Sequence, residues 1–453
     1  MKKLIVFLML ATAASFVFAA GGGQSGGAAA GGEKTKIRFT EWDGGDTLET
    51  YWEIANNFNR SQDKIEVEVI NIPTDYDTKM MAMIAAGDIP ELACMETSTI
   101  MYPLADEGYI VNLLDIFKAD PGFDPKGLFE SVSYWRDANF LAGYTLATET
   151  FGVFYNTELF QKYNVPEPNV TYKQGWTWDA FLNTAQRLTI DNKGNNALSP
   201  NFDPNNIVTY GVTFGRWFAT YWAVYNTTGG PYLAKNNTQY GLFTPEGIDA
   251  MQKLADLIYK YHVAPTPTAA GVLPGMSEAF LSGKVAMALG EGQWTNASLM
   301  FDGVSYNVAP MPMIKQAGST ITAGATCVMN TPKKEAAWEF FKFILTPGSI
   351  KPLEQSGLWM PNHKSELEPS YLNTIITSKH PKNQYEAFYA SLIDGSCGRA
   401  VSGVIKNFNQ VNNEFGAMLD PLWMGEKTYQ QLVNENEARI NALVQGYRET
   451  GKF

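Results

Sequence analysis

Cysteine and histidine are scarce in this chain of 453 residues, which has three of each. Cys94, Cys327 and Cys397 form no C-x-x-C pair, and three histidines give poor support to a zinc site. An odd cysteine count allows at most one disulfide, and we expect all three to be small buried apolar side chains. The sequence therefore predicts neither a metal site nor a cofactor.

Basic residues are outnumbered, since 34 Lys and Arg face 46 Asp and Glu and leave a formal net charge of −12. A chain without a basic surplus cannot neutralise many phosphates, which argues against nucleic acid as a partner. Catalytic motifs are missing too. Outside a glycine-rich stretch near the N-terminus there is no G-x-S-x-G, and the chain has no H-E-x-x-H and no Walker phosphate loop.

Only the N-terminus carries a long apolar stretch. Two lysines precede the apolar run 4–10, and Val17 and Ala19 are spaced like a secretory cleavage site, so we predict a signal peptide over residues 1–19. An uncleaved anchor is the alternative, although the stretch is slightly shorter than the roughly 18 residues of a membrane span. Residues 20–35 are rich in Gly and Ala and read as a flexible tether. Without a lipid-attachment cysteine there, we expect an exported periplasmic protein, soluble after cleavage.

Hydrophobic periodicity predicts a βαβαβ unit after the tether. Alternating apolar residues indicate strands at 37–39, 65–69 and 91–95. Helical spacing indicates two intervening helices, one with Leu48, Trp52, Ala55 and Phe58 on its apolar face and one through 80–84. Such a unit binds ligands at the carboxyl ends of its strands. The candidate loops there are residues 42–46, 73–76 and 96–98.

A second block is mostly helical. Thr177 and Thr244 are expected to cap helices, and a helix ending at Gly283 precedes a strand over 285–289. Residues 191–240, rich in Asn, Gly, Pro and aromatics, read as loops and short strands. A glycine-bracketed turn follows at 290–292, and Thr331 is expected to cap a helix over 332–345.

Six segments together resemble the extracellular solute-binding proteins of ABC sugar importers, the group that includes the maltose-binding protein. The resemblance covers nearly the whole mature chain. The segments are IRFTEWDGGD, DTKMMAMIAAGDIPEL, TETFGVFYNTELFQKYNVPEP, WTWDAFLNTAQRLT, AFLSGKVAMALGEGQW and TPKKEAAWEFFKFILTP. It implies an α/β fold, the two-lobe type II periplasmic binding protein fold, in which several hinge crossings connect the lobes and the ligand is held in the cleft between them.

The expected lobes are each assembled from separate stretches, with crossings near Glu149, Thr320 to Thr322 and residue 354. The N-terminal lobe would comprise 36–148 plus 321–353, and the C-terminal lobe 149–320 plus 354–453. By resemblance, the protein would be a monomer that captures a sugar or oligosaccharide and delivers it to membrane permease subunits, without chemistry of its own.

Sugar capture needs hydrogen-bonding groups for the hydroxyls and flat apolar rings for the C–H faces. Trp42 and Asp43 fall on the loop after the first strand, where the family contacts ligand. A core Trp and a helix-entry Asp are the alternatives. Glu96, Thr97 and Ser98 follow the third strand, but the Trp-x-x-Asp pattern of the maltose-binding branch is missing there.

The remaining candidates come from later segments. Glu149 matches a family carboxylate at the first crossing, with a structural salt bridge as the alternative, and Trp294 matches a family stacking aromatic, with an ordinary buried Trp as the alternative. Of Trp217, Phe218 and Trp222, one or two are expected to face ligand. The further candidates are Glu291, Trp359, Arg399 and Tyr76.

Two other functions fit parts of the pattern. An exported glycoside hydrolase also pairs carboxylates among aromatics, with two acids flanking the scissile bond. A binding protein for a peptide or a phosphorylated polyol is the other alternative, but phosphate capture would favour a basic cluster or a helix N-terminus, and only Arg399 and Arg216 are candidates.

Overall fold

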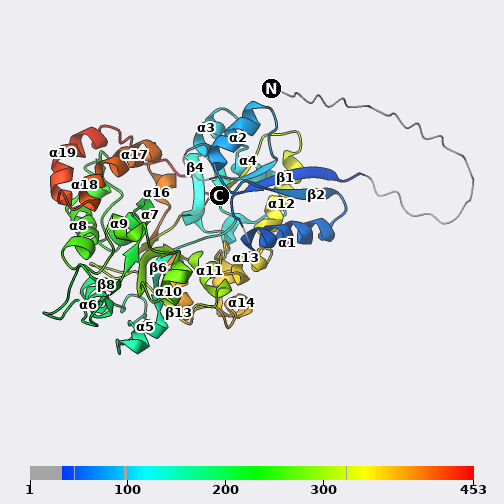
Figure 1. Cartoon of the computed structure of the whole chain (residues 1–453). Helices are drawn as coiled ribbons and strands as arrows, with labels where there is room; N and C mark the ends of the chain where they lie inside the picture. The colour runs from blue at the N-terminus through cyan, green and yellow to red at the C-terminus, as the bar shows by residue number, and fades with distance from the viewer. Residues whose placement is uncertain (1–32, 45, 96–98, 323) are drawn as a thin grey trace, which may run out of the picture. The chain divides into compact units, whose positions relative to one another are not determined.

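The computed structural model describes residues 33–44, 46–95, 99–322 and 324–453, and Lys34–Phe453 form one folded unit. Two main β-sheets organise this unit, with strand orders β2-β1-β3-β15-β5-β4 and β13-β6-β12-β9 (Figure 1). We call the parts built on these sheets the first lobe and the second lobe. The predicted signal peptide and nearly all of the predicted tether lie outside the described residues, as do Glu96, Thr97 and Ser98.

The strands of the first sheet are β1 (Thr35–Glu41), β2 (Ile65–Asn71), β3 (Leu92–Met95), β4 (Ser133–Asp137), β5 (Phe140–Tyr144) and β15 (Ala325–Val328). Those of the second sheet are β6 (Phe151–Asn156), β9 (Thr213–Phe214), β12 (Met287–Gly292) and β13 (Tyr306–Ala309). Shorter pairs are β7 (Ile190–Asp191) with β8 (Ile207–Thr209), β10 (Leu233–Ala234) with β11 (Gln239–Tyr240), and β14 (Ser319–Thr320) with β16 (Cys397–Gly398).

The helices up to the second sheet are α1 (Asp46–Ser61), α2 (Tyr76–Ala85), α3 (Met101–Asp106) and α4 (Leu113–Ala119). Within and after the second sheet come α5 (Thr157–Lys162), α6 (Trp178–Leu188), α7 (Phe218–Asn226), α8 (Pro245–Tyr259), α9 (Pro267–Ala270), α10 (Met276–Leu281) and α11 (Thr295–Phe301). The remaining helices are α12 (Lys334–Ile344), α13 (Lys351–Gln355), α14 (Pro369–Ile375), α15 (Ala390–Ile393), α16 (Val401–Val404), α17 (Phe408–Met418), α18 (Asp420–Trp423) and α19 (Tyr429–Asn441).

The predicted βαβαβ unit is confirmed, because β1 pairs in parallel with both β2 and β3 and the two helices lie between them in the chain. The buried face of α1 differs from the prediction. Tyr51, Ile54 and Phe58 are buried, whereas Trp52, placed on that face from its spacing, is 47% exposed. Ala55 and Phe58 are buried as predicted, while Tyr51 and Ile54 take the places expected for Leu48 and Trp52.

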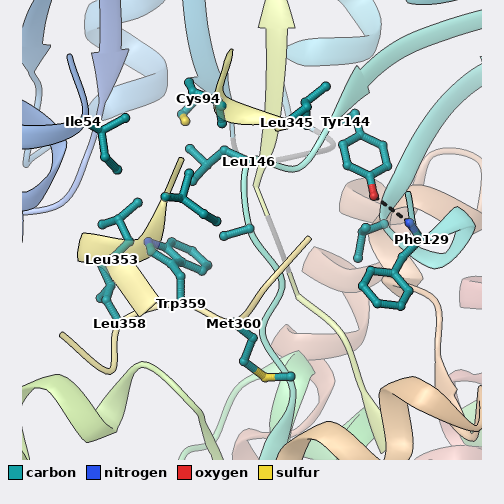
Figure 2. Packing of buried hydrophobic residues seen from close by; sticks show 14 of the residues in the cluster. Ile54, Cys94, Phe129, Tyr144, Leu146, Leu345, Leu353, Leu358, Trp359 and Met360 are labelled. Carbon is teal, nitrogen blue, oxygen red and sulfur yellow. Dashed lines mark hydrogen bonds between the residues drawn. The ribbon is translucent and has the colours of Figure 1, made fainter. Parts of the chain in front are cut away.

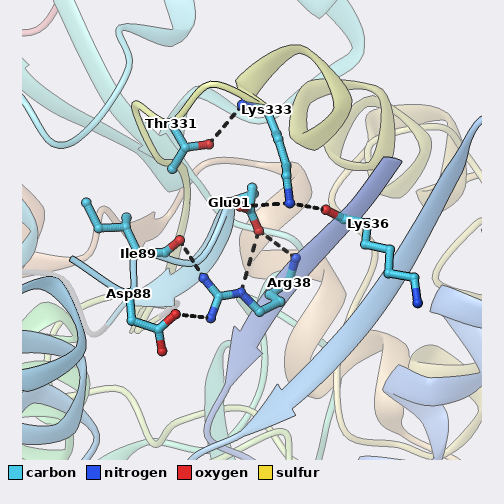
Figure 3. Close-up of polar contacts among 7 residues, drawn as sticks. All are labelled: Lys36, Arg38, Asp88, Ile89, Glu91, Thr331 and Lys333. Carbon is cyan, nitrogen blue, oxygen red and sulfur yellow. Dashed lines mark hydrogen bonds and ion pairs between the residues drawn. The ribbon is translucent and has the colours of Figure 1, made fainter. Parts of the chain in front are cut away.

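A polar cluster ties the N-terminal strand to the start of α12 (Figure 3). The Arg38 guanidinium forms an ion pair with Asp88 at 2.5 Å, and the backbone N–H of Arg38 donates to the buried Glu91 carboxylate at 2.8 Å. Lys333 donates to the carbonyl of Lys36 at 2.7 Å. Thr331, predicted as the cap of this helix, instead accepts from the backbone of Lys333, and the helix begins two residues later than predicted.

Both predicted helix caps of the second lobe are confirmed. Thr177 accepts from the backbone N–H of Ala180, and Thr244 accepts from that of Gly247, each at 3.3 Å. The interpretation of 191–240 as loops and short strands is correct for β7 to β11 but misses α7. That helix is apolar all round and almost wholly buried, so its sequence carries no helical periodicity.

The chain passes between the two sheets through residues 145–150 and through a second segment that includes residues 310–322. The two segments lie beside each other and beside a third segment around Met360. Thr150 forms a β-bridge with Ile321, and Thr148 forms one with Met360. Figure 2 shows the apolar side chains around this third segment, including Leu146 and Trp359.

The third crossing is expected near residue 354, and the residues that follow it contact the first lobe. The Trp359 indole donates to Tyr51 of the first lobe at 3.1 Å, and the Asn362 amide donates to the carbonyl of Leu146. The same stretch also contacts the second lobe, because the Gln293 amide donates to the carbonyl of Gly357 at 2.7 Å. Helix α13 packs on α1, so the segment after residue 354 lies against both lobes.

The last residues of the chain also depart from the expected boundary. Helices α17 to α19 pack in the second lobe, where Phe415 contacts Tyr240. Phe453, however, stacks on Trp135 of β4 at 6.1 Å, and the Arg448 guanidinium lies 3.4 Å from the ring centroid of Tyr102. Residues 448–453 therefore pack against the first lobe, where Figure 1 marks the C-terminus.

The three cysteines are buried, as predicted, and each is a free thiol. In the described part of the chain, no helix combines the length and the apolar character needed to cross a membrane.

Candidate functional site

A cleft of about 370 Å³ brings together loops from both sheets and from the crossings. This volume lies within the range typical of small-molecule sites. Aromatic rings and carboxylates dominate the lining, which consists of Trp42, Asp43, Pro73, Thr74, Asp75, Tyr76, Asp77, Glu149, Trp217, Phe218, Trp294, Thr322, Gly324, Leu358, Trp359 and Ser402.

The first-lobe wall is built on the carboxyl ends of β1 and β2, as the topology predicts. Trp42 follows β1, and Tyr76 begins α2 after β2. Their rings meet edge to face at 5.6 Å and 85°. The Tyr76 hydroxyl is hydrogen bonded to Thr40 of β1 at 2.8 Å, which fixes its ring against the sheet. The Trp42 indole rests directly on Gly324, where a Cβ atom would lie 2.1 Å from Cη2.

Asp43 is held by a chain of hydrogen bonds that reaches the third crossing segment. The buried Tyr51 hydroxyl donates to Asp43 Oδ2 at 2.6 Å and accepts from the Trp359 indole N–H at 3.1 Å. The Asp43 backbone N–H donates to Glu41 at 2.6 Å. Burial raises the pKa of Glu41 to about 7 and also raises the pKa of Asp43 above its usual range. Only Oδ2 of the Asp43 carboxylate is bonded within the described residues, so Oδ1 can accept from a ligand.

Glu149 joins the two crossings at the base of the cleft. It is 7% exposed and lies on the first crossing, directly before β6. The Thr322 hydroxyl, on the second crossing, donates to Glu149 Oε1 at 2.6 Å. A carboxylate at this depth is stable only with partners. A group that bonds to Glu149 therefore contacts a side chain that links the two crossing segments.

The second-lobe wall consists of three aromatic rings. Trp294 contacts Trp217 edge to face at 6.3 Å and Phe151 at 5.3 Å, and Phe218 lies beside Trp217 at 5.2 Å. Again the indoles lie on glycines. A Cβ on Gly292 would lie 1.7 Å from the Trp294 ring, and one on Gly215 would lie 2.8 Å from Trp217.

The predicted glycine turn at 290–292 is a β-bulge inside a strand. Strand β12 continues to Gly292, and its register against β6 shifts between Leu289 and Glu291. Gly290 there has φ +65°, and Thr220 donates to its carbonyl at 3.1 Å. Bulges redirect the side chains that follow them. Here the bulge precedes the turn that carries Trp294 to the cleft.

Seven of the predicted site residues line the cleft: Trp42, Asp43, Tyr76, Glu149, Trp217, Trp294 and Trp359. Glu96 and Thr97 lie outside the described residues. Trp222, Glu291 and Arg399 are not part of the lining.

Trp222 is a correction, because it is fully buried in the second-lobe core. Its ring contacts Tyr225 and Tyr232 at 5.1 Å and Tyr240 at 5.4 Å. Trp222 lies one turn of α7 beyond Phe218, and that helix carries Phe218 to the cleft while Trp222 enters the core.

Arg399 and Glu291 are placed beside the cleft but do not line it. The Arg399 guanidinium donates to the carbonyl of Ser133 on β4 at 2.9 Å, so it joins a second-lobe loop to the first lobe. Burial lowers the pKa of Arg399. The Glu291 carboxylate, next to the bulge, makes no hydrogen bond within the described residues, and burial raises its pKa to about 7.

Several lining residues were not predicted from the sequence. Asp77, Leu358 and Ser402 carry no distinctive motif, and Ser402 comes from α16, far along the chain from the other loops. Asp75 could have been found, because it lies in the loop 73–76 that the strand order marked as a crevice segment. No group of three or more His, Cys, Asp or Glu side chains in the described ranges could hold a metal ion.

A second hollow, of about 580 Å³, runs along α11 and α13. Phe301 is the one aromatic ring in its lining, and it is 72% exposed. This hollow lacks the facing rings and the buried carboxylate of the cleft, so the cleft is the stronger candidate for a specific ligand site.

A family model described as bacterial extracellular solute-binding protein matches residues 53–377, well over half of the chain. The chain belongs to the bacterial extracellular solute-binding proteins. This family consists of binding proteins and not of enzymes, which confirms the predicted class. The cleft just described lies within the fold that this family uses to hold solutes.

Individual relatives agree with this family. The maltotriose-binding protein of Pyrococcus abyssi is 30% identical over 162 residues, which are 34% of this chain and 34% of the relative. The match thus spans about a third of that relative's length.

Solved structures of solute-binding proteins share the fold. An ABC substrate-binding protein from Listeria monocytogenes, in complex with cycloalternan, has a TM-score of 0.74 at 22% identity, covering 90% of this chain and 99% of that chain. The sugar-binding protein MalE from Xanthomonas citri has a TM-score of 0.70 at 15% identity, covering 90% and 97%. These likenesses confirm the predicted α/β periplasmic binding protein fold.

Proposed function

We propose that this solute-binding protein captures a sugar or oligosaccharide in the cleft and delivers it to the permease subunits of an ABC importer. One observation carries the proposal: indole rings from both lobes, Trp42 on one wall and Trp217 and Trp294 on the other, line a single cavity that also contains carboxylates. Indoles suit the C–H faces of a sugar ring, and carboxylates accept strong hydrogen bonds from its hydroxyls. The saccharide ligands of the Listeria and Pyrococcus relatives support the same class of solute.

Binding is coupled to hinge motion in this proposal. Periplasmic binding proteins are a known case of domain closure around a ligand. A ligand that touches Trp42 and Trp294 together gains contacts that only the closed arrangement offers, and it therefore shifts the population towards closure. The closed form is the one that would dock on the permease, in the periplasm, and energy would come from the importer's ATPase subunits.

The glycoside hydrolase alternative finds less support. The cleft carboxylates are Asp43, Asp75, Asp77 and Glu149. Asp43 is bonded to Tyr51, and Glu149 is bonded to Thr322, so each has a positioning partner. A family of binding proteins also gives no reason to expect bond cleavage.

A thermal-shift screen tests the proposal directly, using the purified chain and a panel of mono- and oligosaccharides. A ligand bound only by the native state raises the melting temperature by mass action. We expect at least one saccharide to do so, and Trp294→Ala to weaken its binding at least tenfold, because a stacking wall is lost. Trp52→Ala is the matched control, since Trp52 is exposed on α1, away from the lining residues. The proposal fails if no saccharide shifts the melting temperature, or if both variants bind as tightly as the parent chain.

A further inference from the structure

The charged side chains that line the cleft are all acidic. They are Asp43, Asp75, Asp77 and Glu149, and no Lys, Arg or His from the described residues is in the lining. Residues 45, 96–98 and 323, which the structure does not describe, include no basic residue in the sequence. The cavity and its facing indoles define the site, and the carboxylates add a charge of one sign to it.

Three of these carboxylates form no ion pair with a basic side chain of the described residues. Asp43, Asp75 and Asp77 take part in none of the ion pairs among the described residues, although 15 such pairs occur elsewhere in the chain. Burial raises the pKa of Asp43 and of Asp77, which means that desolvation already disfavours their charged forms. A ligand that brings a positive charge would relieve this cost.

The Asp75 carboxylate takes no part in capping α2. Asp75 precedes α2 in a left-handed conformation, with φ 52°, and its side chain makes no capping hydrogen bond. Its carboxylate is exposed on the rim of the cleft, while that of Asp43 lies deeper and keeps Oδ1 unbonded within the described residues. The acidic lining therefore extends from the rim to the interior.

We propose that the cleft selects a saccharide that carries a protonated amine, an amino sugar, over the neutral sugar of the same shape, and that it rejects acidic sugars. This inference rests on the proposed saccharide-binding function and names its ligand class. An ammonium group donates three hydrogen bonds and also compensates carboxylate charge, whereas a hydroxyl donates one and leaves the charge in place. A phosphorylated or uronic sugar would instead meet repulsion from every charged side chain in the lining.

Matched ligand pairs test the inference on the full mature chain by titration calorimetry. One pair is cellotriose and the glucosamine trimer of the same linkage, and the other is maltotriose and its 6-amino-6-deoxy derivative. In the pair whose linkage fits the cleft, we expect the amine to bind about tenfold more tightly near pH 6.5, which corresponds to about 1.4 kcal/mol. The gain should vanish near pH 9.5, where the amine is neutral, and should shrink at high salt.

Variants locate the charge effect. Asp43→Asn should remove most of the amine preference, and Asp75→Asn should reduce it about threefold, because an exposed charge is better screened. The control is Glu68→Gln, which removes an exposed carboxylate on β2, outside the lining. Asp43→Asn can disturb the Tyr51 contact, so the Asp75 variant keeps the test valid if the Asp43 variant folds poorly.

The outcomes separate the inference from the function beneath it. If a neutral saccharide binds and its amine binds equally or more weakly near pH 6.5, amino-sugar selection is wrong and saccharide capture stands. Tight binding of a trimer of galacturonic acid would also overturn the selection. If no saccharide of any charge binds, the proposed function and this inference fall together.

Discussion

The contact between Gly324 and Trp42 offers a sharp test of how the cleft wall is built, through the substitution Gly324→Ala. The added Cβ would lie 2.1 Å from Trp42 Cη2. Carbon atoms need about 3.6 Å, so the ring has to move by about 1.5 Å. Because Trp42 is only partly buried, it can swing towards the cavity at a small cost in stability, below about 2 kcal/mol. That movement narrows the cleft and breaks the edge contact with Tyr76.

We therefore expect Gly324→Ala to weaken ligand binding by about tenfold or more, with a small change in melting temperature. Titration calorimetry with the best ligand of the saccharide screen measures the affinity, and tryptophan fluorescence reports the displaced ring. Gly416→Ala is the matched control, because a Cβ there meets nothing within 4 Å and lies in helix α17. Unchanged affinity of Gly324→Ala, or a structure of that variant with Trp42 in its original place, would refute the reasoning.

Two further predictions concern buried polar groups. Tyr51→Phe removes the hydroxyl that bonds to Asp43 and Trp359 and leaves both of these groups without that partner. We expect urea denaturation to show a free energy of unfolding that is lower by about 2 kcal/mol. A change below about 0.5 kcal/mol would show that the network contributes little. Burial raises the pKa of Glu291 from 4.5 to about 7 in the folded state, so the folded protein holds the Glu291 proton more tightly than the unfolded chain does. The stability that this proton contributes is on the order of 2 kcal/mol, is fully present below about pH 4.5 and is lost as the pH rises to about 7. Glu291→Gln should flatten that part of the stability-against-pH curve, and an unchanged slope would contradict the assignment.

The first lobe could be predicted well because its sequence signals are local. Alternating residues such as Ile65, Val67 and Val69 have a period of two, and the parallel order of β1, β2 and β3 then places the loops of Trp42 and Tyr76 at one edge of the sheet. Both residues line the cleft for that reason. Trp52 was placed wrongly, since a shift of one residue in an amphipathic helix changes which side chain faces the core.

Other features could not be predicted because they depend on contacts between distant segments. Helix α7 is apolar on every side, so nothing in its sequence separates Phe218, which reaches the cleft, from the buried Trp222. The third crossing segment contacts the first lobe through the bond between Trp359 and Tyr51, which are 308 residues apart. Neither relation leaves a periodic trace in the sequence.

The central claim is that a saccharide lies between the indoles of the two lobes, and a crystal structure of the chain with its best ligand from the thermal-shift screen tests it most directly. We expect a sugar ring in van der Waals contact with Trp42 on one side and with Trp294 on the other, with at least one hydroxyl or amine bonded to Asp43 or Glu149. A ligand seated elsewhere, for example in the hollow beside Phe301, with the cleft occupied only by water, would contradict the account.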